Sequence, residues 1–112
     1  MQKKKKIDSY LGFAKKSGNL AAGTGICRIL ADRGRLRLLI AAEDCAAGSR
    51  EKMERLAEAR DIPFRVYGCS DHLSRMTGTS GRMVFGITDE NFAAMIIREI
   101  DTERMSDKEA FE

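Results

Sequence analysis

The sequence has no tryptophan, one proline and one histidine, and only 6% of its 112 residues are aromatic. So few rings argue against a surface that binds nucleic acid by stacking bases on several aromatic side chains. Tyr67 is the ring that we expect to be exposed. The other aromatic residues considered stand at positions where the apolar pattern faces the core, and they are Tyr10, Phe13, Phe64, Phe85 and Phe92.

Long apolar segments are also missing. The chain contains no run of about 18 apolar residues, so we expect neither a transmembrane helix nor contact with a membrane. Its basic start is not followed by an apolar stretch, which argues against a secretory signal. We expect a cytoplasmic chain that forms a single domain and acts as a monomer.

The three cysteines, Cys27, Cys45 and Cys69, form no CxxC pair, and only His72 could join them as a metal ligand. The spacing therefore predicts no zinc site, and no cofactor motif is present. We expect reduced thiols in or near the core. A catalytic cysteine is the alternative, and it would require a basic group beside the thiol.

Positive charge is concentrated in the first third of the chain. Residues 1–37 contain ten Lys or Arg and two Asp, a net charge of +8, whereas the remainder has ten Lys or Arg and fifteen acids, a net charge of −5. This asymmetry favours a polyanionic partner such as nucleic acid. The alternative is that the lysine run at residues 3–6 is a solvated arm.

Apolar periodicity and glycine positions predict alternating helices and strands. We expect helices near residues 5–17, 25–33, 49–60, 70–78 and 89–101, and strands near 19–22, 37–42, 64–67 and 82–87. This order predicts an α/β domain with helices on both faces of its sheet. We divide the chain into a basic arm (1–6), one domain (7–101) and an acidic, frayed tail (102–112).

Local signals predict how these helices begin, end and face the core. We expect Thr24 to cap the second helix, Ser70 or Asp71 the fourth, and Thr88 or Asp89 the last. Gly18, Gly34 and Gly78 are expected to close the first, second and fourth. The predicted core face of the second helix carries Ile26, Ile29 and Leu30.

The first candidate binding site is Gly23-Thr24-Gly25, at the start of the second predicted helix. Free backbone N–H groups and the helix dipole favour an anion there, and glycines allow a phosphate to approach closely. Basic residues that could add charge are Lys15, Lys16 and Arg28. The alternative is that the two glycines only form a tight turn.

The second candidate is the small, polar loop before the last strand, and its site residues are Thr77, Gly78, Thr79, Ser80, Gly81 and Arg82. Such residues suit contact with an RNA backbone or an unstacked base. The alternative is an ordinary helix-to-strand connection. Glu43 and Asp44 follow a buried strand but lack a third catalytic group, so we expect Asp44 to cap the third helix or to form a turn.

Five segments in order resemble the L-seven-Ae/L-thirty-e ribosomal-protein superfamily, and most closely its small bacterial YlxQ-like members. They are the stretch from Leu11 to Gly23, the stretch from Arg35 to Ala46, Ile62-Pro63-Phe64, the stretch from Leu73 to Gly78, and the stretch from Arg82 to Asp89. The resemblance implies a three-layer α-β-α sandwich with a small four-stranded mixed sheet. It also implies RNA binding, usually to kink-turns, through the start of the second helix and the loop before the last strand.

One part of the family pattern is absent. Kink-turn binders typically carry Asn, Glu and Lys where this chain has Gly25, Ile26 and Ile29. RNA binding must therefore rest on charge and backbone donors.

We expect a non-catalytic RNA-binding protein, associated with the ribosome, whose target is ribosomal or kink-turn-like RNA. The alternative is a protein-interaction module on the same fold that has lost kink-turn recognition. An enzyme is the third possibility, but no nucleophile–base or metal pattern supports it.

Overall fold

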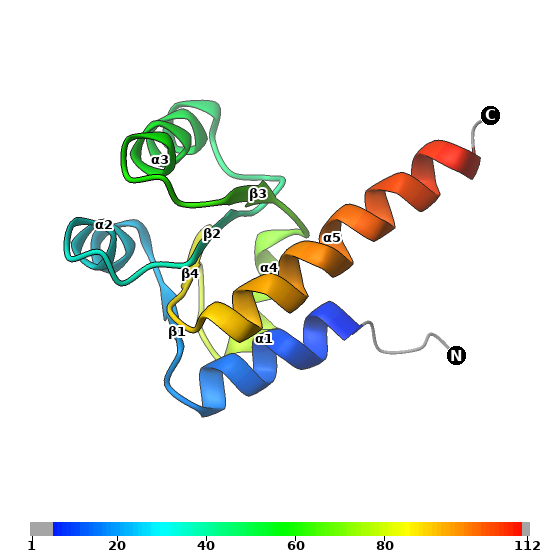
Figure 1. Cartoon of the computed structure of the whole chain (residues 1–112), viewed down its shortest axis with the longest axis horizontal. Coiled ribbons are helices and arrows are strands. Elements are labelled where there is room, and N and C mark those ends of the chain that lie inside the picture. The colour runs from blue at the N-terminus through cyan, green and yellow to red at the C-terminus, as the bar shows by residue number, and fades with distance from the viewer. Residues whose placement is uncertain (1–5, 111–112) are drawn as a thin grey trace.

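In the computed structural model, residues 6–110 are described, with side chains for residues 6–104. Helices and strands alternate along the chain (Figure 1). The elements are α1 (Lys6–Lys16), β1 (Leu20–Ala22), α2 (Thr24–Asp32), β2 (Leu38–Ala41), α3 (Ala47–Ala59), β3 (Phe64–Val66), α4 (Ser70–Thr77), β4 (Val84–Ile87) and α5 (Glu90–Ala110). The predicted order of elements is confirmed.

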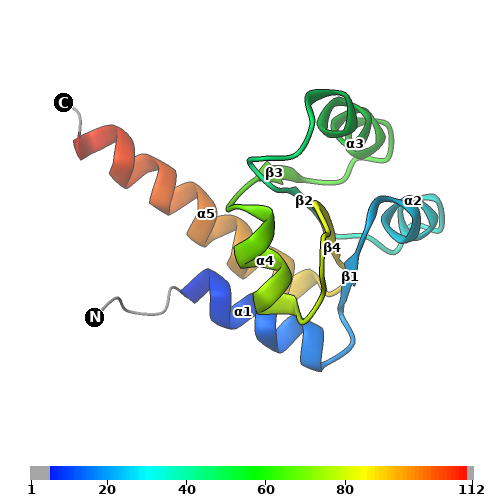
Figure 2. The same cartoon turned by 180° about the vertical axis from the view of Figure 1, so that it is seen from behind.

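The four strands form one mixed sheet in the order β1-β4-β2-β3. β2 and β3 are parallel, whereas β4 is antiparallel to both β1 and β2. Helices α2 and α3 cover one face, and α1, α4 and α5 cover the other (Figures 1 and 2). The structure is thus the predicted three-layer α-β-α sandwich.

β2 is buried on both faces, as its continuous apolar sequence predicts. Because side chains alternate along a strand, Leu38 and Ile40 pack in the core beneath α1, α4 and α5. Leu39 and Ala41 pack in the second core, beneath α2 and α3. This strand therefore contributes side chains to both cores of the sandwich.

Gly86 of β4 allows α2 and the following loop to lie close to the sheet. A Cβ at Gly86 would lie 2.6 Å from Leu36 Cδ2 and 3.1 Å from Cys27 Sγ. Both neighbours are buried and have little room to move. The absence of a side chain here fixes the start of α2 close to β4.

Several predicted helix caps differ from the structure. Gly23, with φ 118°, precedes α2, and Thr24 is its first residue and makes no capping hydrogen bond. α4 begins at Ser70, and neither Ser70 nor Asp71 caps this helix. Instead, the Ser70 N–H donates a hydrogen bond to the Asp44 carboxylate from the loop after β2. Asp44 lies in a turn, as one alternative predicted, but it does not cap α3, which starts at Ala47.

The remaining predictions of where helices begin and end are confirmed. Asp89 caps α5, because its carboxylate accepts the Phe92 N–H at 2.8 Å. Positive φ angles occur at the three glycines predicted to close helices, Gly18, Gly34 and Gly78.

The predicted core face of α2 is wrong for Ile26 and Ile29, whereas Leu30 is half-buried and packs against the core as predicted. Ile26 and Ile29 are 43% and 48% exposed, while Cys27 and Ala31 pack on the sheet. Small residues are needed on this face because α2 lies so close to Gly86. The isoleucines consequently form an apolar surface on the solvent side of the helix.

Two predicted aromatic positions are also reversed. Phe13 is 55% exposed, because Leu11 and Ala14 occupy the core face of α1. Tyr67 is half-buried against the core, and burial, together with the nearby Asp8 carboxylate, raises the pKa of its hydroxyl. Among the residues that the structure describes, the most exposed aromatic ring is therefore that of Phe13 rather than that of Tyr67.

α5 extends beyond the predicted boundary at residue 101 and continues to Ala110. Arg65 of β3 makes two hydrogen bonds to Asp101, at 2.9 and 3.1 Å, and Arg104 donates to the Val66 carbonyl. These contacts hold the helix against β3 where the sequence alone shows little apolar periodicity. Residues 1–5 of the predicted arm and residues 111–112 of the predicted tail lie outside the described residues.

Candidate nucleic-acid interface

The start of α2 presents unsatisfied backbone donors. The first N–H bonded within the helix belongs to Cys27, which donates to Gly23 O at 3.2 Å, while Gly23 N–H donates to Val84 O at 2.8 Å. Helix geometry leaves Thr24, Gly25 and Ile26 without intrahelical acceptors, and no side chain caps them. No acidic residue lies in the first turn, so the helix dipole there is open to an anion.

Arg82 joins the second predicted site to the first. A Cβ at Gly23 would lie 3.5 Å from Arg82 Nη1, so the guanidinium lies against the residue that precedes α2. The loop that carries Arg82 is held by Ser74, whose hydroxyl is 3.3 Å from both the N–H and the carbonyl of Arg82. Two sites predicted separately from the sequence thus meet at one place.

The start of α3 lies beside this point, which sequence reasoning missed. Two adjoining clefts of about 280 and 230 Å³ share Thr24 and Ser49. We call them together the helix-start site, and its principal lining residues are Gly23, Thr24, Gly25, Arg28, Cys45, Ala46, Ser49, Lys52, Gly81, Arg82 and Met83. Like α2, α3 has no side-chain cap and no acid in its first turn. The lack of an acidic residue in the first turn of both helices was the sequence signal that could have pointed to the start of α3 as part of the site.

The charge of the helix-start site is positive. Its cations are Arg28, Lys52 and Arg82, and none of them forms a salt bridge within the described part of the chain. Burial raises the pKa of the Cys45 thiol, so this group is neutral at physiological pH and does not oppose an anion. The arrangement can bind phosphate groups through backbone donors and three side chains.

Lys15 and Lys16 lie elsewhere. They line a groove of about 390 Å³ between α1 and α4, together with Thr77 and Gly78 from the second predicted site. We call it the α1–α4 groove, and its other lining residues are Asp8, Ser9, Gly12, Phe13, Arg75 and Met76. The structure therefore divides the predicted site residues between two surfaces.

Thr79 and Ser80 connect these two surfaces and line neither cleft. Thr79 is half-buried, and its Oγ1 lies 3.0 Å from Thr77 Oγ1. Its N–H donates to Ser74 O at 2.8 Å. Ser80 is exposed at the tip of the loop.

Asp44, His72 and Cys27 have structural rather than catalytic surroundings. Both carboxylate oxygens of Asp44 accept from Ser70, and these bonds lower the Asp44 pKa. His72 Nε2 lies 2.9 Å from Asp8 Oδ1. Burial raises the pKa of the Cys27 thiol to about 12. Among the residues that the structure describes, no group of three His, Cys, Asp or Glu could hold a metal ion.

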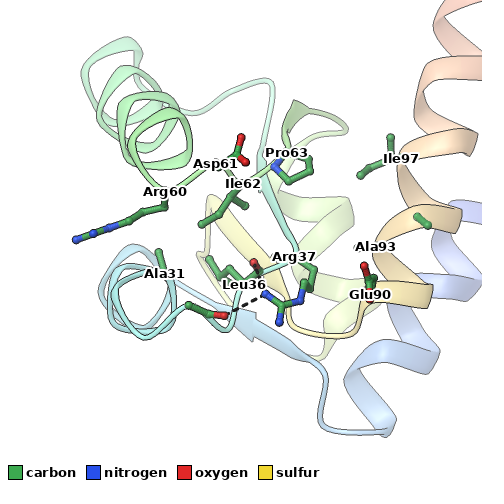
Figure 3. A pocket seen from close by; sticks show the side chains of 12 residues that line it. Ala31, Leu36, Arg37, Arg60, Asp61, Ile62, Pro63, Glu90, Ala93 and Ile97 are labelled. Carbon is green, nitrogen blue, oxygen red and sulfur yellow. Dashed lines mark hydrogen bonds between the residues drawn. The ribbon is translucent and has the colours of Figure 1, made fainter.

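A further cleft of about 330 Å³ lies at the opposite end of the sheet, where α2 ends and α5 begins (Figure 3). Its walls are Leu36, Ile62 and Ile97, and Arg37 on its rim donates to Gly34 O at 3.0 Å. Asp61 and Glu90 add negative charge to the rim. This mixed charge suits a polyanion less well than the helix-start site does.

Comparison with known proteins gives structural neighbours only. No family model and no curated protein matches the sequence. A solved structure of a protein of unknown function from Bacillus halodurans has a TM-score of 0.84, with 26% identity over 88% of this chain and 99% of that chain. None of the described helices is long and apolar enough to cross a membrane.

A 15.5 kD RNA-binding protein from Giardia lamblia has a TM-score of 0.72, with 17% identity over 89% of this chain and 92% of that one. At this identity the likeness concerns the fold. The chain therefore shares its fold with an RNA-binding protein.

Proposed function

We propose that this protein is a non-catalytic RNA-binding protein that contacts structured RNA through the helix-start site. The observation that carries the proposal is the position of Arg82, whose guanidinium lies against Gly23 at the uncapped start of α2. Phosphate recognition commonly combines helix N-termini with Arg and Lys side chains. The fold shared with an RNA-binding protein supports the same proposal.

The remaining parts of the proposal rest on the family resemblance. We include association with the ribosome, a cytoplasmic location, a monomeric state and kinship with the YlxQ-like proteins. Selectivity for kink-turns is the least supported part, because Gly25, Ile26 and Ile29 provide no amide, carboxylate or ammonium group. Contact through backbone donors and three cations favours recognition of RNA shape over base identity.

The test is a filter-binding titration against a kink-turn RNA and against a duplex of the same length without the kink, at two salt concentrations. We expect binding to weaken steeply with salt, because phosphate contacts release counterions. Arg82→Ala should weaken binding to both RNAs and reduce the salt slope by about one. Arg98→Ala, which removes an exposed arginine of α5, is the matched control and should bind as the parent does.

A second substitution tests the backbone donors. Gly25 has an ordinary φ and no atom within 4 Å of its Cβ position, so Gly25→Asp fits the fold. An aspartate there favours the helix but repels phosphate, and we expect RNA affinity to fall without loss of stability. Unchanged affinity in both Gly25→Asp and Arg82→Ala would remove this surface from the proposal.

A protein-interaction module is the second candidate, favoured by the exposed Ile26 and Ile29 on α2. It predicts that neither RNA binds and that a protein partner is lost on Ile29→Lys. The same titrations separate the two candidates, because Ile29→Lys should not weaken RNA binding.

A further inference from the structure

The α1–α4 groove combines an exposed aromatic ring with positive charge. Phe13 is the most exposed of the large hydrophobic side chains in the described residues, at 55%. Lys15 and Lys16 on α1 and Arg75 on α4 line the same groove, and all three side chains are exposed. None of these cations forms a salt bridge with another described residue.

The shape of the groove leaves the ring accessible. Gly12 lines the same groove, and no other part of the fold lies within 4 Å of its Cβ position, so the groove is open at this point. The one carboxylate that lines the groove, Asp8, is buried and lies 2.9 Å from His72 Nε2. The three exposed cations therefore outnumber this one buried carboxylate in the groove.

The groove is also continuous with the helix-start site along the chain. Thr77 and Gly78 line the groove, and the loop that follows them carries Arg82, whose guanidinium lies against Gly23. Ser74 fixes this loop to α4, and α1 packs directly against α4 (Figure 2). Only Thr79 and Ser80 separate the residues of this segment that line the groove from those that line the helix-start site.

We propose that the α1–α4 groove binds a single-stranded RNA segment, with one unpaired base stacked on Phe13 and the adjacent phosphates contacted by Lys15, Lys16 and Arg75. The inference rests on the proposed function, since the segment would extend from the structured RNA held at the helix-start site. An aromatic ring flanked by cations is the arrangement that binds single strands without reading their sequence. An acidic protein would satisfy the cations but would leave the flat ring without a stacking partner.

Phe13→Trp provides a direct reporter, because the chain has no other tryptophan. The substitution is at an exposed position and should leave the fold intact, which thermal unfolding followed by circular dichroism checks. We expect a short oligouridylate to quench Trp fluorescence in this variant, since a stacked base lies on the indole. Ala59→Trp, at the exposed end of α3, is the control and should not be quenched.

Affinity is measured with an RNA hairpin that has or lacks a single-stranded uridine extension. Phe13→Ala should weaken binding of the extended hairpin about 5- to 150-fold, the range that one base–aromatic stack provides, and should leave the blunt hairpin unchanged. Arg75→Ala should reduce the salt slope for the extended hairpin by about 0.7, and Arg75→Lys should restore it.

The outcomes separate this inference from the proposed function. If the blunt hairpin binds but the extension adds neither affinity nor quenching, the groove inference is overturned and the proposed function stands. If the oligouridylate quenches Trp fluorescence in the Phe13→Trp variant while Arg82→Ala leaves hairpin binding unchanged, the proposed function fails instead. Equal quenching by polyglutamate would show that the groove selects negative charge alone, which also overturns the inference.

Discussion

At the scale of single residues, Gly86 determines how closely α2 approaches the sheet. Gly86→Ala would place a methyl group 2.6 Å from Leu36 Cδ2, inside a core where Leu36 is 3% exposed. We expect a loss of about 1–3 kcal/mol in the free energy of unfolding, the usual effect of overpacking a core. Urea unfolding followed by circular dichroism measures it.

Gly12→Ala is the matched control for this prediction. Gly12 lies within α1, has an ordinary φ and has no atom near its Cβ position. Alanine is the better helix former, so we expect a gain of about 0.5–1 kcal/mol. A Gly86→Ala variant as stable as the parent would show that Leu36 can move aside freely.

The wrong sequence predictions at this scale share a cause. α2 carries apolar residues on two faces, so periodicity alone cannot tell whether Ile26 and Ile29 or Cys27 and Ala31 face the core. The choice depends on Gly86, about 60 positions later in the sequence, because its missing side chain favours small residues opposite. Phe13 was misplaced similarly, since Leu11 and Ala14 already satisfy the core face of α1.

At the scale of elements, Asp44 connects the loop after β2 to the start of α4. Its carboxylate accepts the Ser70 hydroxyl at 2.6 Å and the Ser70 N–H at 2.8 Å, and these bonds lower its pKa. The unfolded chain therefore binds protons more readily at this site. The stabilisation is present above about pH 4, the ordinary aspartate pKa, and is lost as the pH falls through the lower folded pKa.

Asp44→Asn should reduce this acid dependence. We expect the variant to be less stable than the parent at neutral pH, and the difference to shrink as the pH is lowered below about 4. Urea midpoints across a pH series measure the effect. Glu43→Gln is the control, because the Glu43 carboxylate accepts no hydrogen bond from the described residues, and a constant difference at all pH values would contradict the assigned role of Asp44.

The order of elements was predictable because apolar periodicity and the glycines at helix ends are local signals. The caps were less predictable because two depend on distant segments. Ser70 meets Asp44 across 26 positions, and Gly23 is held by Val84 of β4. The end of α5 was misplaced for the same reason, since Arg65 and Arg104 hold it against β3.

At the scale of the whole molecule, the three cysteines differ in how much of the fold must open before they react. Cys69 is exposed, Cys45 is 7% exposed and Cys27 is fully buried, with its thiol pKa raised to about 12 by burial. We expect an alkylating reagent to modify Cys69 rapidly in native buffer. Cys27 should react only at the rate of global unfolding, because it lies between α2 and the sheet.

Mass spectrometry of labelled chains across a urea series measures this order. Cys27 labelling should rise together with the loss of circular dichroism signal. If Cys27 reacts in native buffer as quickly as Cys69 does, α2 must separate from the sheet while the rest of the molecule stays folded.

The candidate site was predictable in parts rather than as a whole. The sequence marked the start of α2 and the loop before β4 separately, through glycines and charge. Arg82 lies against Gly23, whereas Lys15 and Lys16 line a different groove. Both facts follow from how the two halves of the sandwich pack, which the sequence does not show. Lys52 and Ser49 were missed because no local signal shows that the start of α3 lies beside the start of α2.

The two outer strands of the sheet are both very short. β1 and β3 have three residues each, and on β3 the Val66 carbonyl already accepts a bond from Arg104. A strand from another molecule would find few free backbone groups along either edge. The longer and more apolar β2 and β4 lie between them. The same strand order that builds the core thus also protects the folded chain from edge-to-edge aggregation.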